Sequence, residues 1–451
     1  MPTGRGRWGA LANEYKSPRW RHLRPRGFRM SALNRGTVPK VDGHWRWYEC
    51  CFLIWRIEGS FCLNQAFSEN FEPELRVIRR IAEMIKLGST YPIGIDIHRH
   101  NIYAVQLKKT HEGLAIRGLA RTEVENGAEK ASEADDVLIP KLKEIANKKA
   151  FRGKRVLVHL PSEQIYTFPI TIQVGEGSTV EEAILLESGK HLPFPVEEAS
   201  IDYPSIVSAP SGKAQKYKAT IMAVQIERMK QFVLMLKQAG LVVEAVDADI
   251  ASLVRLHYYL HQVDAEPIIL CHVGYTRTLL SIVTQDRILV HRSVPWGIQI
   301  LLTKLQENLE LSHGQSRVLL KEYGLFCKDR ESLGQSARLT DEDDTTESML
   351  RAISQIITPY VEALIYEFHN VIGYVISEEP DARGQAIYVY GHANFIRDLD
   401  RYLENALNTP TKLVNPMMNM PLLEDSMLPD LSEGAPFSLA LGLAMRKVPW
   451  L

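Results

Sequence analysis

The stretch IGIDIHRHNIYAVQL, from Ile93 to Leu107, decides the fold of this chain. Two apolar runs, Ile93–Ile97 and Ile102–Leu107, flank a short polar turn, and this pattern predicts two paired strands. Asp96 lies near the end of the first run, where the opening hairpin of a nucleotide-binding domain carries a carboxylate. The turn itself holds His98, Arg99 and His100. Because a phosphate-binding turn needs glycine and small hydroxyl side chains, the hairpin predicts the fold and leaves nucleotide binding open.

The pattern of this hairpin occurs a second time. A third apolar run, Leu114–Thr122, completes the first set, and a buried strand is predicted at Arg155–Leu160. The strands of the second set are predicted at Ile268–Val273, Thr278–Thr284 and Arg287–Ser293, with a buried strand at Ala386–Tyr390 and a short one at Thr411–Val414. Such a repeat predicts two lobes that are built alike.

A compact α+β unit interrupts the first set. Its predicted strands are Tyr166–Ile172, Ile201–Ser208 and Tyr217–Gln225, the last two forming a hairpin, and its first helix is Glu181–His191, capped by Ser178 or Thr179. The second helix of this unit is Glu227–Ala239. The predicted helices outside it are Val137–Lys149, Ile298–Leu309, His313–Lys321, Met349–Val371, one from Phe395, and Phe437–Arg446. The acidic stretch Asp341–Glu347 is expected to be a solvated loop or the start of the long helix.

These elements predict an α/β fold with a definite division of the chain. The division is an N-terminal extension at 1–83, a first lobe at 84–161 and 241–262, an inserted α+β unit at 162–240, and a second lobe at 263–451.

Composition indicates an ordinary globular protein. The 451 residues are 45% hydrophobic and 24% charged, with a formal net charge of −1, so no general attraction to nucleic acid or anionic lipid is expected. No apolar run reaches the roughly 18 residues that span a bilayer, and the first residues lack a secretion signal. The five cysteines show no paired spacing, which favours reduced thiols in the cytosol.

Residues 1–83 differ from the rest of the chain. They hold 13 Arg and 2 Lys against 8 acidic residues, five of the seven tryptophans, and no sustained helical or strand period. One interpretation is a basic arm for an anionic surface. The interpretation that we favour is that this segment is not native sequence, with translation starting at Met84.

Markers spread over residues 84–448 carry a resemblance to a known family. They include the opening hairpin, KHLPFPVEEASIDY (Lys190–Tyr203), VGYTRTLLSIVTQDRILVHRSVPWG (Val273–Gly297), IYVYGHANFIRDLDRYLENAL (Ile387–Leu407) and FSLALGLAMR (Phe437–Arg446). In this order and spacing they resemble type IV pilus assembly protein PilM, of the actin-like ATPase superfamily and related to the cell-division protein FtsA. The resemblance implies an actin-like, ribonuclease H-like fold of two lobes with an inserted α+β subdomain.

In that superfamily three loops converge on a nucleotide between the lobes. The resemblance assigns the corresponding positions, as a degenerate site, to Asp96, Gly274, Thr276, Thr278 and Gly391. Each loop departs from the usual pattern. The departures are His98 for the turn glycine, Tyr103 for a lysine, His272 for a carboxylate, Trp296 for one of a glycine pair, and His392 beside Gly391. A lone carboxylate is a poor Mg²⁺ site, so we expect no catalytic residue, no ATP hydrolysis and no cofactor; ATP with Mg²⁺ is the alternative.

Metal binding is a second interpretation of the histidines. His98, His100, His272 and His392 lie on three loops that this fold would bring together, and imidazole is a good zinc ligand. The sequence shows no repeated spacing of the kind that metal ligands have. We therefore favour the interpretation that these histidines are neutral side chains that fill the cleft, or protonated side chains that hold another anion together with Arg99.

The resemblance also implies partners. It suggests a cytoplasmic protein, peripheral to the inner membrane, that binds the N-terminal tail of a PilN-like membrane protein between the first lobe and the inserted unit. Leu192 and Phe194 could form an apolar lip there, or could simply fasten the helix end to its own core. PilO-like protein and the pilus motor ATPases are expected as indirect partners. No amphipathic helix follows Arg446, so membrane contact is expected only through partners.

Three functions from different classes follow. The first is a scaffold for a type IV pilus platform, serving twitching motility, or for a similar type II secretion platform, with a pseudo-ATPase cleft. The second is an actin-like ATPase whose nucleotide state changes partner binding. The third is an FtsA-like division protein, which the residues after Arg446 disfavour.

Overall fold

The structure is a computed structural model that describes most of the chain beyond residue 89. The described residues are 90–98, 100–124, 134–175, 178–204, 206–209, 215–261, 267–285, 287–326, 341–423 and 433–446. The expectations for residues 1–83, for Arg99 and for the residues after Arg446 lie outside these ranges.

A five-stranded sheet forms the first lobe. Its strands are β1 (Thr90–Ile97), β2 (Asn101–Thr110), β3 (Gly113–Glu123), β4 (Arg155–His159) and β9 (Val242–Asp247), in the order β3-β2-β1-β4-β9. The first three pair antiparallel, whereas β4 runs parallel to β1 and β9 parallel to β4. The helices of this lobe are α2 (Ala134–Ala146), α4 (Ile226–Gln238), α5 (Asp249–Leu260) and α11 (Ser438–Ala444). The prediction placed α4 in the inserted unit at 162–240, but α4 packs against α2 and β9, because its apolar face belongs to the core of the first lobe.

The second lobe repeats this sheet. Its strands are β10 (Ile268–Val273), β11 (Thr278–Val283), β12 (Ile288–Val294), β13 (Ile387–Gly391) and β14 (Thr411–Leu413), in the order β12-β11-β10-β13-β14. Again three antiparallel strands are followed by two parallel ones. Its helices are α6 (Ile298–Leu309), α7 (His313–Glu322), α9 (Asp341–Glu378) and α10 (Leu399–Leu407). The repeat predicted from the sequence is therefore confirmed.

The inserted unit has a small sheet of its own. Its elements are β5 (Tyr166–Val174), α3 (Val180–Ser188), β6 (Ala199–Asp202), β7 (Ile206–Ala209) and β8 (Gln215–Gln225). Thr179 caps α3, and Glu182 completes the capping box. The predicted strand Ile201–Ser208 was wrong in one respect, because β6 and β7 are separate strands that both pair with β8. Pro204 lies in the break, and proline cannot donate a backbone hydrogen bond to a neighbouring strand.

Two predicted helices have different bounds. The long helix α9 already begins at Asp341 and continues to Glu378, so the acidic stretch is the start of the helix. The helix expected from Phe395 begins only at Leu399, because residues 392–395 form a 3-10 turn, η6 (His392–Phe395), and Asp398 has a φ of 59°. A left-handed residue interrupts an α-helix.

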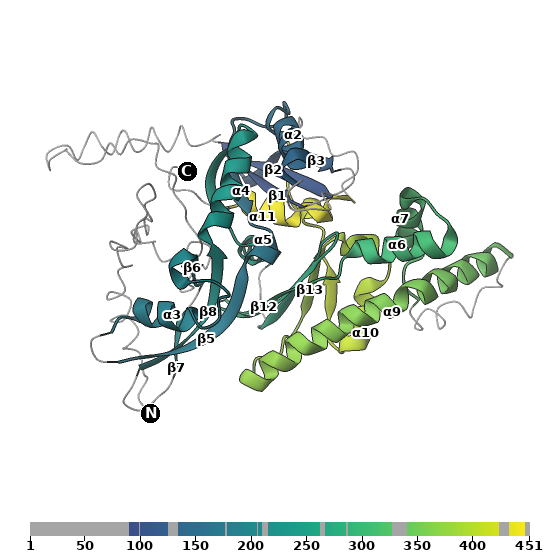
Figure 1. Ribbon diagram of the computed structural model, residues 1–451. Coiled ribbons are helices and arrows are strands. Elements are labelled where there is room, and N and C mark those ends of the chain that lie inside the picture. The colour runs from purple at the N-terminus through teal and green to yellow at the C-terminus, as the bar shows by residue number, and fades with distance from the viewer. Residues whose placement is uncertain are drawn as a thin grey trace.

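The last helix returns to the first lobe. Residues 263–451 were assigned to the second lobe, yet α11 packs against β1 and α5, and Figure 1 shows the yellow helix among the first-lobe elements. Gly94 permits this contact, because a Cβ there would lie 2.1 Å from the carbonyl oxygen of Ala440. Gly442 packs as closely on Ser252 of α5.

Among the described residues, no helix is both long enough and apolar enough to cross a bilayer.

Candidate functional site at the cleft between the lobes

Strand ends from both lobes meet at one buried cleft. Asp96 lies near the end of β1 and His159 at the end of β4, while His272 lies near the end of β10 and His392 directly follows β13. In each lobe these two strands run parallel, so their carboxyl ends reach the same edge of the sheet. All four side chains are at most 7% exposed.

Asp96 is an ionised carboxylate held by two histidines. Its Oδ1 lies 2.8 Å from Nε2 of His159 and 2.9 Å from Nε2 of His98, and the residue has no exposed surface. Burial alone would raise the pKa of Asp96, but His98 and His159 outweigh burial and hold that pKa well below its usual range. The second oxygen, Oδ2, has no hydrogen-bond partner among the described residues.

His159 is the cation of the cleft. Its Nδ1 lies 2.9 Å from the carbonyl oxygen of Leu160, which can only accept, and its Nε2 faces the carboxylate of Asp96. Both ring nitrogens must therefore donate, which requires the imidazolium form. Burial lowers the pKa of His159, but the hydrogen bond and charge of Asp96 outweigh it and raise the pKa to about 9. The cleft thus contains an internal ion pair.

His272 and His392 are neutral. Burial lowers the pKa of His272 to about 4; burial, and then His272, lowers the pKa of His392 to about 3. His392 donates from Nδ1 to the carbonyl oxygen of Val273 at 3.3 Å and accepts at Nε2 from the hydroxyl of Tyr103 at 3.1 Å. That hydroxyl keeps its proton, because burial raises the pKa of Tyr103 well above its usual range. His392 therefore ties the two lobes together.

Tyr275 contacts aromatic residues of both lobes at the cleft. The ring of Tyr275, in the turn after β10, lies 4.8 Å from that of His100 and 6.1 Å from that of His392, centroid to centroid. Its hydroxyl is 3.1 Å from Nε2 of His313 on α7. Aromatic side chains from both lobes are thus in contact at this point.

The other predicted nucleotide positions lie in the same turns. The amide of Gly274 donates to the carbonyl oxygen of Arg277 at 2.8 Å, and Gly391 has a φ of 77°. Thr276 is exposed, whereas Thr278 is buried and its hydroxyl has no hydrogen-bond partner among the described residues. Both turns keep the glycine that their backbone requires.

The four histidines of the metal interpretation take different roles. His98 contacts Asp96, His100 contacts Tyr275, and His272 and His392 lie close enough to affect each other's charge. Within the described residues, no group of three or more histidine, cysteine, aspartate or glutamate side chains is placed to hold a metal ion. Metal binding by these histidines stays an untested alternative.

The two residues of the predicted apolar lip on the inserted unit, Leu192 and Phe194, have different surroundings. Leu192 packs against the core beneath the small sheet, which includes Ile170. Phe194 instead meets the ring of Tyr166 edge to face, with centroids 5.5 Å apart, and Tyr166 is 37% exposed. Phe168 and His191 stack beside them, so a partly exposed aromatic cluster of Tyr166, Phe168, His191 and Phe194 marks this unit.

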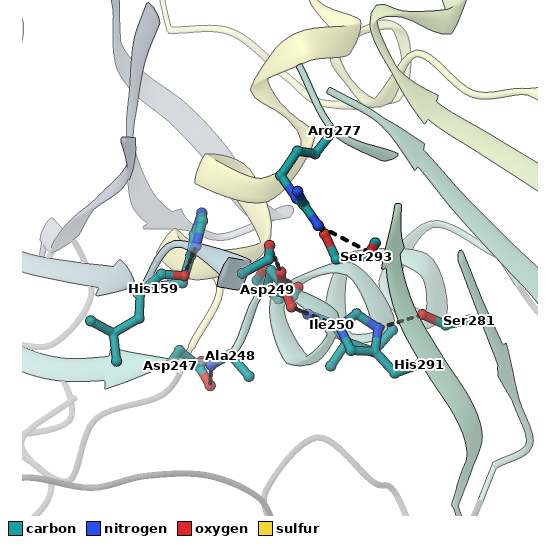
Figure 2. A network of polar contacts seen from close by, with 12 residues as sticks. His159, Asp247, Ala248, Asp249, Ile250, Arg277, Ser281, His291 and Ser293 are labelled. Atoms are coloured by element: carbon teal, nitrogen blue, oxygen red, sulfur yellow. Dashed lines mark hydrogen bonds and ion pairs between the residues drawn. The ribbon is translucent and has the colours of Figure 1, made fainter. Parts of the chain in front are cut away.

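The sequence analysis missed His159 and the network behind it. His159 ends a predicted strand, as Asp96 does, so the same rule about strand ends could have found it. It lies beside a second buried carboxylate, Asp249, at the start of α5, and Figure 2 shows His291 of the second lobe facing that carboxylate. No local pattern in the sequence connects Asp249 with His291.

A family model described as type IV pilus assembly protein PilM matches residues 94–331 and 347–448, which is more than half of the chain. The chain belongs to the PilM family. A solved structure described as the PilM-PilN type IV pilus biogenesis complex is similar with a TM-score of 0.60 and 19% identity, over 79% of this chain and 98% of that one.

More distant similarities accompany this PilM match. The ethanolamine utilization protein EutJ from Carboxydothermus hydrogenoformans has a TM-score of 0.41 and 11% identity, over 83% of this chain and 98% of that one. MreB5 of Spiroplasma citri bound to ADP has a TM-score of 0.39 and 12% identity, over 78% and 94%. The fold is α/β and actin-like, as predicted, and the chain is a type IV pilus assembly protein of the PilM family.

Proposed function

We propose that this chain is a cytoplasmic scaffold of a type IV pilus inner-membrane platform, which binds the N-terminal tail of a PilN-like membrane protein. Family membership carries the proposal, together with the similarity to a protein solved in complex with PilN. Through that tail the scaffold would lie at the inner membrane and connect indirectly to a PilO-like protein and to the motor ATPases. A type II secretion platform is the related alternative.

The aromatic cluster of the inserted unit is the surface that we assign to the tail. Phe194 and Tyr166 offer rigid apolar area that is partly exposed, which suits a short apolar segment of a partner. Leu192 packs mainly against the core of the inserted unit, so it would contribute less to binding of the tail.

Phe194→Ala should weaken tail binding about tenfold or more, because truncating a central aromatic side chain removes a large share of a small interface. The measurement is calorimetric titration with a peptide from the N-terminus of the PilN-like protein encoded nearby. Leu186→Ala is the matched control, since Leu186 is 74% exposed on the helix of the same unit. Equal affinity of all three proteins would reject the assigned surface, and failure of the unaltered chain to bind any such peptide would reject the scaffold.

We further propose that the cleft does not hydrolyse ATP. Mg²⁺ needs carboxylate oxygens, and Asp96 has only Oδ2 left to offer, because its Oδ1 is paired with His98 and His159. The imidazolium of His159 supplies the positive charge that a metal would otherwise bring. His392 and Tyr275 occupy volume beside the glycine turns. These residues do not fit ATP with Mg²⁺.

A nucleotide switch is the rival function, and one observation favours it. Asp96 is ionised and both glycine turns are retained. Titration of fluorescent mant-ATP with Mg²⁺ separates the two functions, and thermal shift serves as a second readout. We expect no saturable binding at micromolar concentrations. Micromolar affinity that disappears in Asp96→Ala would establish the rival instead.

A further inference from the structure

One buried carboxylate connects all three parts of the chain. Asp249 begins α5 of the first lobe, and its Oδ2 accepts a hydrogen bond of 2.5 Å from the hydroxyl of Ser162, where the chain enters the inserted unit. Its Oδ1 lies 3.3 Å from Nε2 of His291 on β12 of the second lobe. Figure 2 shows Asp249 and His291 turned toward each other from different lobes.

The carboxylate is charged and enclosed. Asp249 is 1% exposed, and its Oδ1 also accepts from the backbone amide of Ile250 at 2.6 Å. Burial would raise the pKa of Asp249, but His291, and after it His159 and Ser162, hold the pKa well below its usual range. A buried charge that loses its partner is strongly unfavourable, so the position of His291 against Asp249 is constrained.

His291 is itself oriented from within the second lobe. Its Nδ1 lies 2.8 Å from the hydroxyl of Ser281 on the neighbouring strand β11. The order serine, histidine, aspartate is that of a hydrolytic relay, but Ser281 has no exposed surface and a substrate could not reach it. The serine instead holds the imidazole in position for the contact with Asp249.

Further contacts join the inserted unit to β12 and its neighbours. The hydroxyl of Thr220 on β8 donates to the carbonyl oxygen of Ile288 at 2.9 Å, and this bond is buried. Near the turn before β11, Nε of Arg277 lies 3.6 Å from the carboxylate of Glu163. The contacts of the inserted unit with the second lobe are therefore concentrated around β12.

We propose that the Asp249–His291 pair is a clasp that fixes the inserted unit and the first lobe against β12. When it is closed, the three parts have one relative position. When it opens, the inserted unit is held less firmly against the second lobe. The described contacts that remain are the Thr220 hydrogen bond, the ion pairs Arg277–Glu163 and Lys218–Glu378, and the packing of Met222 in the same buried cluster as Ile288. A second part of the proposal rests on the proposed function: the clasp couples binding of the tail at the inserted unit to the position of the second lobe.

Two substitutions test the clasp. Asp249→Asn and His291→Gln keep similar size and hydrogen-bonding ability but cannot form the ion pair. We expect hydrogen exchange in β12, β5 and β8 to quicken about tenfold or more, while α6 and β13 stay protected. Arg292→Gln is the matched control, because Arg292 neighbours His291 but pairs with Glu367 of α9 at 3.2 Å, within the second lobe. This control should leave β5 and β8 unchanged.

The possible results of these experiments test the clasp and the proposed function separately. Unchanged exchange in β5 and β8 of a folded His291→Gln protein overturns the clasp, whether or not Asp249→Asn folds. Faster exchange together with at least a threefold change in the affinity of the tail peptide supports both the clasp and the coupling. Faster exchange in a protein whose unaltered form binds no tail peptide supports the clasp and rejects the proposed function.

Discussion

A single histidine sets the electrostatics of the cleft. His159 donates from both ring nitrogens and so carries a charge at neutral pH, between the carboxylates of Asp96 and Asp249. His272 and His392, equally buried, stay neutral because burial lowers the pKa of each and no carboxylate in the described part of the chain accepts a hydrogen bond from them. Burial alone therefore does not determine the charge of a histidine here. The charge of each histidine depends on the hydrogen-bond partner of each ring nitrogen.

Stability should fall as the pH rises through about 9. The pKa of His159 is about 9 in the folded chain against an ordinary 6.5, so its stabilising charge is complete below about 6.5 and is lost through the folded pKa. This difference in pKa corresponds to a contribution on the order of 3 kcal/mol to the free energy of unfolding. The free energy of unfolding in urea, measured from about pH 6 to about pH 10, checks this. His159→Gln should remove most of the slope, and an unchanged slope would contradict the assignment.

Among the elements, α11 shows how closely helix and sheet can pack. Its sequence SLALGLA is small and apolar, and every residue of it is buried. Gly94 on β1 and Gly442 on α11 remove the side chains that would hold the helix away from the sheet and from α5. The tight contact allows the last helix of the described chain to cover the first strand.

Gly94→Ala should destabilise the protein by roughly 3 kcal/mol. The new Cβ would lie 2.1 Å from the carbonyl oxygen of Ala440 and 2.5 Å from the amide nitrogen of Ala444, so α11 would have to move. Gly314→Ala on α7 is the matched control, because a Cβ there meets nothing within 4 Å and should stabilise the helix by about 0.5–1 kcal/mol. Thermal and urea unfolding measure both. A neutral Gly94→Ala would contradict the packing.

At the scale of the whole molecule, the sequence predicted the two sheets and much of the cleft. Apolar runs placed strands such as β1 and β10, and the resemblance to PilM brought the loops with Asp96, His272 and His392 together. Local patterns could not predict the pairing of Asp249 with His291, because it depends on how one lobe is rotated against the other. They also could not place α11, since its contact with β1 depends on a close approach at Gly94 that no apolar pattern reveals.

The return of α11 to the first lobe has a consequence for the order of synthesis. A ribosome releases β1 long before residues 438–444, so the face of the strand around Gly94 must wait for nearly the whole second lobe to be translated. A nascent chain could complete the inserted unit early, but the sheet beside it would remain uncovered. That face of the first lobe is therefore covered only after the second-lobe elements that precede α11 have been translated.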